Sequence, residues 1–332
     1  MPKNLTLPEH GATDSGSEPE LDFSSNAHPL GPCPVSVRAL RRYCPSRYPD
    51  PSYLRLRQTL GDLHGVDPDQ VVPGSGAAEL IHRLVRLHGG TVQHRRPGFG
   101  EYAHAAQCAG LPTLVFTDPA CVNPLPGTLF LCLPDNPDGH VPSTDTLGAL
   151  AERCRTQGTC LVLDLAYLPF LASPPALPPS AVHLHAPNKA AGLTGVRAAY
   201  ALAPDPNLGQ QLAALAPSWV VGTEGLGFLE AVADPDARAW LDSTAPQARR
   251  LRSHLASVLR GHGFETRESE ATHLVARHPE WTDSGELAAR LREAGVRVRD
   301  TTSMGLPGWV RLAARPETEI ERLDQILTTF SR

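Results

Sequence analysis

Lys189 is the first candidate for chemistry, because the 30 basic residues of the chain comprise only two lysines, Lys3 and Lys189, and 28 arginines. A genome rich in GC would explain the excess of arginine. It would not explain why one lysine persists in mid-chain, where arginine could carry any surface charge. A lysine amine can be neutralised and can form a Schiff base, which arginine cannot do. Lys189 is therefore a candidate nucleophile, with an ordinary surface charge as the alternative.

Two polar motifs precede Lys189 in the chain. Asn136 in LPDNPDG (133–139) and Asp164 in VLDLAYLPF (162–170) each follow an apolar segment typical of a strand. Open α/β sheets hold their ligands just after such strands. Asn136 could donate to a ring oxygen, or it could form an Asx turn. A buried Asp164 needs a cation such as a pyridinium N–H, unless it caps a helix or pairs with an arginine.

A third motif, PGSGAAEL (73–80), predicts a strand that runs through glycines into a helix. Free N–H groups at a helix start bind anions, most often phosphate, although a tight glycine turn is the alternative. The motif lacks the Gly-Lys-Ser/Thr of a P-loop and the third glycine of a dinucleotide fingerprint, which disfavours an ATPase or a nicotinamide enzyme. Arg197, eight residues after Lys189, could also meet a phosphate. Lysine, aspartate and arginine together match the aldehyde, ring nitrogen and phosphate of pyridoxal phosphate.

The elements that must position these residues follow from the apolar pattern. Between about residues 68 and 205, segments typical of strands alternate with helical patterns, which predicts a mostly parallel sheet. A long helical stretch follows, and after it come strand and helix patterns in an order typical of a smaller α+β domain. We expect a flexible arm over residues 1–20, a segment over 21–50 that packs with the small domain, a large cofactor-binding domain over 51–215, and a small C-terminal α+β domain over 216–332.

These motifs, in this order, resemble the fold-type I pyridoxal phosphate enzymes of aminotransferase class I/II. The resemblance is to the branch that holds histidinol-phosphate aminotransferase and threonine-phosphate decarboxylase, and it covers about residues 20–330. It implies an α/β fold in which helices flank a mostly parallel mixed sheet in a large domain, beside a smaller α+β domain. It also implies pyridoxal 5'-phosphate as the cofactor.

The resemblance implies roles for individual residues. Lys189, Asp164 and Tyr167 would be catalytic, with Lys189 forming the Schiff base and Asp164 meeting the ring nitrogen. The further cofactor contacts that it implies are Asn136 and Tyr167 at the ring hydroxyl, Phe99 on the ring face, Arg197 with the backbone of Gly76, Ala77 and Ala78 at the phosphate, and Asn188 beside the lysine.

The resemblance also indicates a substrate and a partner. Arg311 in GWVRLAAR matches the arginine that binds a substrate α-carboxylate, and Asn26 and His273 would lie near the substrate. Tyr48 in SRYPDP matches a tyrosine that reaches the neighbouring subunit's cofactor, which implies a homodimer. We expect a transaminase that acts on a small phosphorylated amino acid or amine.

The alternative activity is that of threonine-phosphate decarboxylase, an enzyme of cobalamin synthesis. It is favoured by HG (10–11), LDFSSNAHPLGP (21–32) and VRDTTSMGLPGWVRLAARP (298–316). A cofactor-binding protein without catalysis and an unrelated α/β protein are two further alternatives. An N-terminal helix-turn-helix is missing, and this argues against the first of them.

Several positions depart from the family pattern. Asn188 and Ala186 stand where the family usually has Ser or Thr near the phosphate, Leu165 stands where Glu is common, and His273 stands where Asn is usual. Each lost hydroxyl removes a hydrogen bond of about 0.5–1.5 kcal/mol. These departures bear on cofactor affinity and on the identity of the substrate.

The charge and the cysteine content indicate which partners and which cellular location to expect. The formal charge is −5, and this argues against nucleic acid or an anionic membrane as a partner. Seven cysteines without a C-x-x-C pair, and the lack of a signal peptide or a long apolar stretch, predict a cytoplasmic protein. We expect no metal, since His183 and His185 form an H-x-H motif without an evident third ligand.

Overall fold

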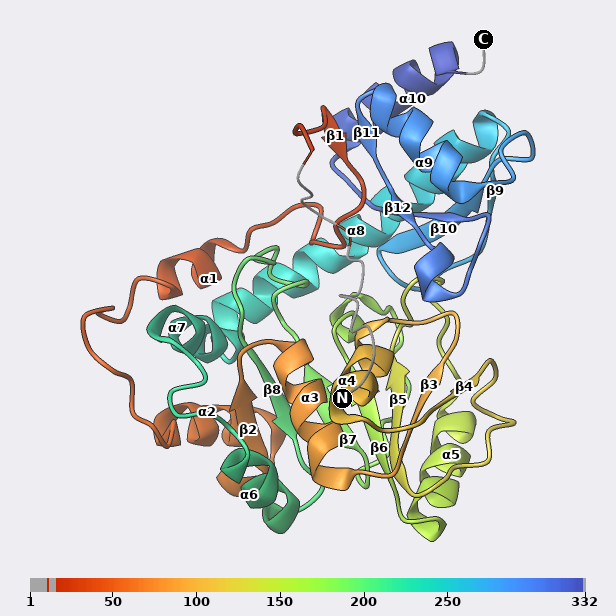
Figure 1. Ribbon diagram of the computed structural model, residues 1–332. Helices are drawn as coiled ribbons and strands as arrows, with labels where there is room; N and C mark the ends of the chain where they lie inside the picture. Colours follow the sequence, from red (N-terminus) through yellow and green to blue (C-terminus); the bar gives the residue numbers. More distant parts are fainter. Residues whose placement is uncertain (1–10, 12–15, 331–332) are drawn as a thin grey trace.

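The computed structural model describes residue 11 and residues 16–330, and its largest sheet has seven strands in the order β2-β8-β7-β6-β5-β3-β4 (Figure 1). β8 is antiparallel to both neighbours, and the other pairs of this sheet are parallel. The expected mostly parallel mixed sheet is confirmed. Its strands are β2 (Val71–Gly74), β3 (Thr91–Arg95), β4 (Thr113–Phe116), β5 (Gly127–Cys132), β6 (Thr159–Asp164), β7 (Val182–His185) and β8 (Ala199–Leu202).

Helices cover both faces of this sheet because alternate residues of a strand point to opposite sides. Phe130 and Val162 pack with α3 and α4, whereas Leu129 and Leu161 pack with α5. α2 and α7 pack around the end of the sheet formed by β2 and β8. The helices of this body are α2 (Leu54–His64), α3 (Ala77–His88), α4 (Glu101–Ala109), α5 (Thr144–Thr156), α6 (Pro206–Ala214) and α7 (Thr223–Val232), with 3-10 turns η1 (Pro68–Gln70) and η2 (Leu168–Phe170).

The second body is built on an antiparallel sheet in the order β12-β13-β10-β9. Its core is apolar and includes Leu274 and Leu312 from the sheet and Leu287 and Leu323 from the helices that cover it. The elements are β9 (Glu265–Thr266), β10 (His273–Arg277), α9 (Ser284–Glu293), β11 (Val296–Arg297), β12 (Arg299–Asp300), η3 (Thr302–Met304), β13 (Val310–Ala313) and α10 (Glu317–Phe330).

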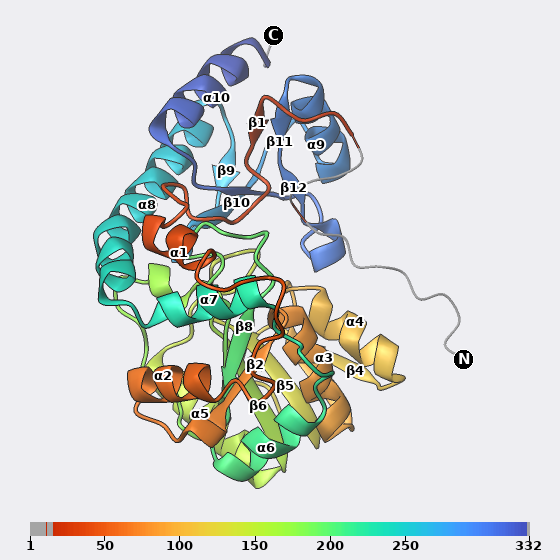
Figure 2. The ribbon, with the colours of Figure 1, turned by 90° about the vertical axis from the view of Figure 1, so that its left-hand side faces the viewer.

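One long helix, α8 (Pro235–Gly261), connects the two bodies (Figure 2). Its first half packs on the large body through Ala245 and Ala248, and its second half joins the small-body core through Leu255 and Leu259. α7 packs with α2 and β8 of the large body. The packing therefore changes from one body to the other within α8, after the boundary expected at residue 215.

The N-terminal segment also contacts both bodies. β1 (Leu21–Asp22) pairs in parallel with β11 of the small body, as expected for residues 21–50. α1 (Pro34–Ala39) instead lies against α7, where Gly227 faces the backbone of Ala39. Most of the arm expected over residues 1–20 lies outside the described residues. None of the helices in the described part of the chain has the length and apolar character of a membrane span.

A glycine-to-alanine pair tests the packing of α1 on α7. A Cβ atom at Gly227 would overlap the carbonyl oxygen of Ala39, whereas Gly148 in α5 has no atom within 4 Å of the added carbon. Gly227→Ala should lower the free energy of unfolding by about 1–3 kcal/mol through overpacking. Gly148→Ala should raise it by about 0.5–1 kcal/mol, because alanine loses less backbone entropy in a helix.

Urea unfolding followed by circular dichroism measures both changes. Equal effects of the two substitutions would contradict a close contact between α1 and α7.

Candidate active site

Most of the expected site residues line one cleft at the carboxyl edge of the large sheet, where the small body and the N-terminal segment meet it. Three loops carry polar groups to this edge: those that follow β5, β6 and β7. The expected residues that line the cleft are Asn26, Ala77, Ala78, Phe99, Asn136, Asp164, Tyr167, Asn188, Lys189, Arg197 and Arg311.

Asp164, the last residue of β6, is buried in this cleft. Its Oδ2 accepts a hydrogen bond from the Tyr102 hydroxyl at 2.9 Å, and its Oδ1 accepts one from the Ala166 N–H at 3.1 Å. Burial raises the pKa of Asp164, and these two hydrogen bonds partly oppose the rise. No arginine of the described residues pairs with it, although it does hold the turn that follows β6. A cationic ring N–H beside this carboxylate would offset its desolvation.

Lys189 lies in the loop that joins β7 to β8. Asn188 closes the loop, since its Nδ2 donates to the carbonyl oxygen of Thr194 at 3.3 Å. Burial lowers the pKa of Lys189 to about 8, and the positive charges of Arg311 and Arg197 add to this effect, while Asp164 opposes it. An amine with this pKa is partly neutral near physiological pH, as a nucleophile or general base requires.

Arg311 on β13 is buried, and in the described part of the chain no carboxylate pairs with it. Its Nη1 donates to Asn136 Oδ1 at 2.6 Å and its Nη2 donates to the Ser24 carbonyl oxygen at 2.6 Å, while its Nε has no partner. Burial lowers the pKa of Arg311 to about 10. A buried guanidinium without an acid beside it is suited to bind an anionic ligand.

The start of α3 and Arg197 form the anion-binding end of the cleft. Gly76 has φ +89°, and a Cβ there would lie 2.7 Å from Arg197 Nη2, so only glycine lets the guanidinium approach. Ala77 and Ala78 open α3, whose first N–H groups have no partner within the helix. A phosphate fits this arrangement of N–H groups and one cation.

Asn26 and Tyr167 form a buried pair on another side of the cleft. The Asn26 Nδ2 donates to the Tyr167 hydroxyl at 3.1 Å, and Asn26 Oδ1 has no partner among the described residues. The Tyr167 hydroxyl can still donate its own hydrogen to a ligand. Burial raises the pKa of Tyr167 to about 12, so the phenol is protonated at neutral pH.

Two expected side chains lie outside the cleft, and Gly76, which precedes Ala77, is not among its lining residues either. His273 is fully buried behind Tyr167, with their ring centroids 4.9 Å apart, and does not line the cleft. Tyr48 is 79% exposed and stacks on Trp219 with the ring centroids 4.4 Å apart. The sequence predicts that Tyr48 reaches the cofactor of a neighbouring subunit, and that expectation stays a prediction.

The sequence reasoning missed several residues of the site. Tyr102, which is buried, holds Asp164 and packs its ring edge-on to Phe99, with the ring centroids 5.6 Å apart. A second aromatic residue close to Phe99 in the sequence was the available signal. The cleft residues that the sequence analysis did not select are Gly11, Ser24, Ser25, Glu101, Cys132, Ala166, Thr194 and Gly195.

A buried ion-pair network holds the turn that carries Asn136. Arg95 Nη1 lies 3.0 Å from Asp135 Oδ2, and its Nη2 lies 2.8 Å from Asp138 Oδ2. The Asn136 N–H donates to Asp135 Oδ1 at 2.8 Å. Burial raises the pKa of Asp135, and the charge of Arg95 and the hydrogen bond from the Asn136 N–H oppose the rise. The turn therefore places the Asn136 side chain toward Arg311 and does not depend on an Asx turn made by Asn136 itself.

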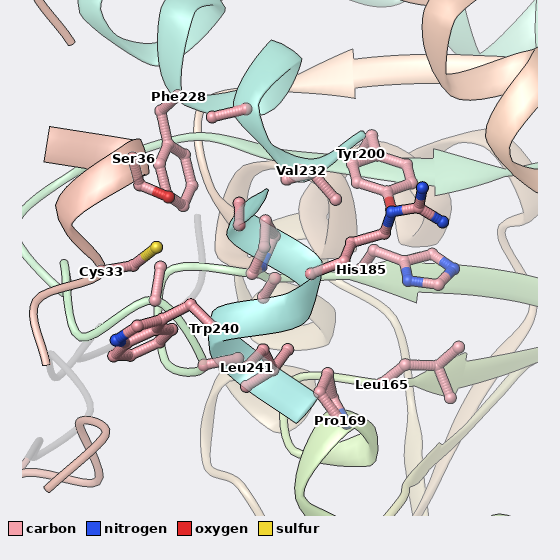
Figure 3. A pocket seen from close by; sticks show the side chains of 17 residues that line it. Cys33, Ser36, Leu165, Pro169, His185, Tyr200, Phe228, Val232, Trp240 and Leu241 are labelled. Carbon is pink, nitrogen blue, oxygen red and sulfur yellow. The ribbon is translucent and has the colours of Figure 1, made fainter. Parts of the chain in front are cut away.

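A second cavity lies between α1, α7 and the first turns of α8 (Figure 3). Its walls are mostly apolar, and Phe228, Trp240 and Leu241 are prominent among them. Neither Lys189 nor Arg311 reaches it. The groups needed for anion binding and amine chemistry are therefore gathered in the first cleft alone among the cavities of the described residues.

Comparisons with known proteins agree with this geometry. The family model for aminotransferase class I and II matches residues 18–330. Histidinol-phosphate aminotransferase of Jannaschia sp. is 28% identical over 337 residues, covering 95% of this chain and 92% of that protein. Threonine-phosphate decarboxylase of Salmonella typhimurium is 36% identical over 178 residues, covering 48% of this chain and 49% of that protein.

Solved structures share the fold. The histidinol-phosphate aminotransferase from Sinorhizobium meliloti, solved in complex with pyridoxal-5'-phosphate, has a TM-score of 0.80 at 20% identity, and the match covers 94% of this chain and 92% of that chain. The chain therefore belongs to the aminotransferase class I and II family. Within it, the similarities confirm the branch of fold-type I pyridoxal phosphate enzymes that holds histidinol-phosphate aminotransferase and threonine-phosphate decarboxylase, and with it the expected pyridoxal phosphate-dependent transaminase class.

The lowered pKa of Lys189 can be measured directly. In a Lys3→Arg variant Lys189 is the only lysine, so its side chain is the only one with an amine to acylate in cofactor-free protein. Peptide mapping separates it from the N-terminal amine. The acylation rate should reach half its maximum near pH 8. An additional Arg197→Met substitution removes a positive neighbour and should raise this midpoint.

Mass spectrometry of the Lys189 peptide, from protein labelled at a series of pH values, gives the profile. A midpoint at the ordinary lysine value of 10.5 would contradict the burial of this amine beside two arginines.

Proposed function

We propose that the cleft binds pyridoxal 5'-phosphate and transfers the amino group of a small, phosphorylated amino acid or amine. The observation that carries this proposal is the gathering of three charged groups, the buried Asp164 and Arg311 and the partly buried Lys189, beside the open start of α3. None of the three has a salt-bridge partner among the described residues. Such groups are costly to bury unless a ligand completes them.

The residues fit the cofactor group by group. Lys189 would hold the aldehyde carbon covalently, Asp164 would accept the ring N–H, and Arg197 with the N–H groups of Ala77 and Ala78 would hold the phosphate. Asn136 retains its Nδ2 group, and Tyr167 its hydroxyl hydrogen, for the ring hydroxyl. The Phe99 ring at the cleft wall would cover the ring face.

The catalytic roles follow from the charges. When bound, the cofactor supplies an electron-withdrawing ring that stabilises negative charge at the substrate Cα. Asp164 keeps that ring protonated by accepting its N–H. Arg311 binds an anionic group of the substrate and orients it. The Lys189 amine, once free, would move the proton between the substrate Cα and the cofactor carbon. Its pKa of about 8 suits this proton transfer.

The second candidate activity is decarboxylation of threonine phosphate, a reaction of cobalamin synthesis. It is supported by the 36% identity to the decarboxylase of Salmonella typhimurium over about half of each chain. The same residues serve both reactions, because the bond that breaks is the one held perpendicular to the cofactor ring. Transamination is favoured because the aminotransferase of Jannaschia sp. matches 95% of this chain.

A homodimer completes the proposal. Tyr48 is exposed on the surface near α2 and α7, outside the cleft of its own chain, so it is available to reach the phosphate of a neighbouring subunit.

All seven cysteines are free, and this supports a reducing, cytoplasmic location. We also propose that the body built on the small sheet is a separate C-terminal α+β domain beside the large cofactor-binding domain.

Replacing Lys189 tests cofactor attachment. Lys189→Ala should abolish the visible absorbance band that pyridoxal phosphate gives with the wild-type protein, because no other described amine lines the cleft. Lys3→Ala is the matched control and should keep the band. A band that persists in Lys189→Ala would place the attachment elsewhere and sink the assignment.

The substrate class is tested by product analysis. Threonine phosphate and histidinol phosphate are each supplied to the holoenzyme with 2-oxoglutarate or pyruvate, and glutamate is supplied with pyruvate. Transamination predicts consumption of the keto acid and no CO₂, whereas decarboxylation predicts CO₂ from threonine phosphate alone. Arg311→Gln should lower kcat/KM for the true donor about 10- to 100-fold, since a charge-assisted hydrogen bond contributes about 1.5–3 kcal/mol.

No turnover with any of these donors, together with an intact cofactor band, would instead favour a cofactor-binding protein without catalysis.

A further inference from the structure

A second group of side chains with metal-binding chemistry lies between α3 and α4. His82 comes from α3, and Glu101 and His104 come from α4. One ligand atom from each of the three lies within 4.8 Å of the other two. His82 Nε2 is 3.0 Å from Glu101 Oε1, and the two imidazole centroids are 5.6 Å apart. The sequence analysis did not find this group, because it considered only the H-x-H motif on β7.

The fold explains why these three residues meet. α3 and α4 lie side by side over the same face of the large sheet (Figures 1 and 2). Glu101 and His104 are three residues apart on α4 and therefore share a face of the helix. His82 presents its ring to that face from α3. The arrangement is fixed by the packed core beneath it.

The geometry points to a site for one divalent transition-metal ion of the zinc class, with His82, Glu101 and His104 as its protein ligands. Ligand atoms at about 2.0–2.2 Å from a tetrahedral zinc lie about 3.3–3.5 Å from one another. The separations in the cluster, 3.0 Å between His82 Nε2 and Glu101 Oε1 and at most 4.8 Å among all three ligand atoms, bracket these values. Two imidazoles with one carboxylate suit zinc, whereas Mg²⁺ and Ca²⁺ prefer sites made of oxygen.

Two further observations support the site. The Nδ1 atom of His104 is buried and has no hydrogen-bond partner among the described residues. Cys108, one turn further along α4, places its Sγ 3.5 Å from His104 Nε2. This distance matches the separation of nitrogen and sulfur ligands on a tetrahedral zinc, about 3.5 Å, so Cys108 can join the site if Nε2 of His104 is the bound nitrogen. If Nδ1 binds instead, Nε2 keeps its contact with Cys108 and water takes the fourth position. The fourth position is thus open to water or to the Cys108 thiolate.

A bound metal would act on the neighbouring cleft. Glu101 lines both the cluster and the cleft, and Tyr102, the next residue, donates to Asp164. A metal that joins His82 to Glu101 and His104 links α3 to α4 and restrains the helix turn that carries Tyr102. This inference goes beyond the proposed function and does not depend on it, because the ligands are separate from Lys189 and Arg311.

Zinc binding to the full chain, saturated with pyridoxal phosphate and treated with a chelator, tests the inference. Equilibrium dialysis should give one Zn²⁺ per chain at this site. His82→Ala and His104→Ala should each weaken its binding at least tenfold, and the double variant should lose it. His88→Ala, on the same helix outside the cluster, is the matched control and should bind as the wild type does.

Thermal unfolding provides a second measurement that guards against misfolded variants. Zn²⁺ should raise the unfolding midpoint of the wild type and of His88→Ala, because a ligand of the native state stabilises it. It should leave the midpoint of the double variant unchanged, while the midpoints in chelator show that each variant folds. Co²⁺ in place of Zn²⁺ should give the visible bands of a tetrahedral site.

Zinc binding of equal affinity and stoichiometry in the wild type and the double variant would overturn the proposal, as would the lack of any zinc-dependent shift in the wild-type midpoint. Cys108→Ser decides the fourth ligand. If the thiolate binds the metal, this variant loses the near-ultraviolet charge-transfer band of the cobalt form; if water does, the variant keeps the wild-type cobalt spectrum.

Discussion

The hydrogen bonds of Arg311 join the three parts of the chain that make the cleft. The arginine stands on β13 of the small body, its Nη1 reaches Asn136 after β5 of the large body, and its Nη2 reaches the carbonyl oxygen of Ser24 in the N-terminal segment. Each bond is 2.6 Å long and is buried, so water competes weakly with it. Misplacement of Asn136 or of Ser24 would leave the buried guanidinium with one acceptor fewer. Arg311 therefore links the large body and the N-terminal segment to the small body at the site.

The cleft departs from the pairing rule that the rest of the chain follows. Elsewhere, buried charges meet opposite charges, as Arg95 does with Asp135 and Asp138. In the cleft, Asp164 has only neutral hydrogen-bond donors and the described residues give Arg311 only neutral acceptors. Burial of such groups costs several kcal/mol each. The apolar cores on both faces of the sheet stabilise the fold and offset this cost. The arrangement is one that a charged ligand would stabilise.

Much of the fold was predictable from the sequence, because the strands of the large sheet are short apolar segments separated by helices with regular apolar spacing. Asp164 was found for a related reason, because it is a polar residue at the end of an apolar strand, whereas Lys189 was found as the one lysine in mid-chain. Contacts between distant segments were not predictable in this way. The Tyr102–Asp164 hydrogen bond joins residues 62 positions apart, and the register that brings them together is set by the packing of α4 on β5 and β6.

The dependence on contacts between distant segments also explains why the packing of α7 and the position of His273 were not predictable from the sequence. The sequence around residue 215 changes in character, but α7 packs on the large body because its apolar face meets α2 and β8. His273 was selected by its motif, and tertiary packing places it behind Tyr167, away from the cleft. A motif gives the type of a residue and its neighbours in sequence, whereas the direction of a side chain depends on tertiary packing.

The reversed direction of β8 has a consequence for how the chain can vary. Because β8 is antiparallel to β7, the loop between them begins and ends at the same edge of the sheet, and it carries both Lys189 and Arg197. The separation between the reactive amine and the anion-binding guanidinium is thus set within a single short connection, braced by Asn188 and Thr194. A change in the length of this connection would alter both groups together. Insertions are therefore better tolerated at the opposite edge of the sheet, where connections hold no part of the site.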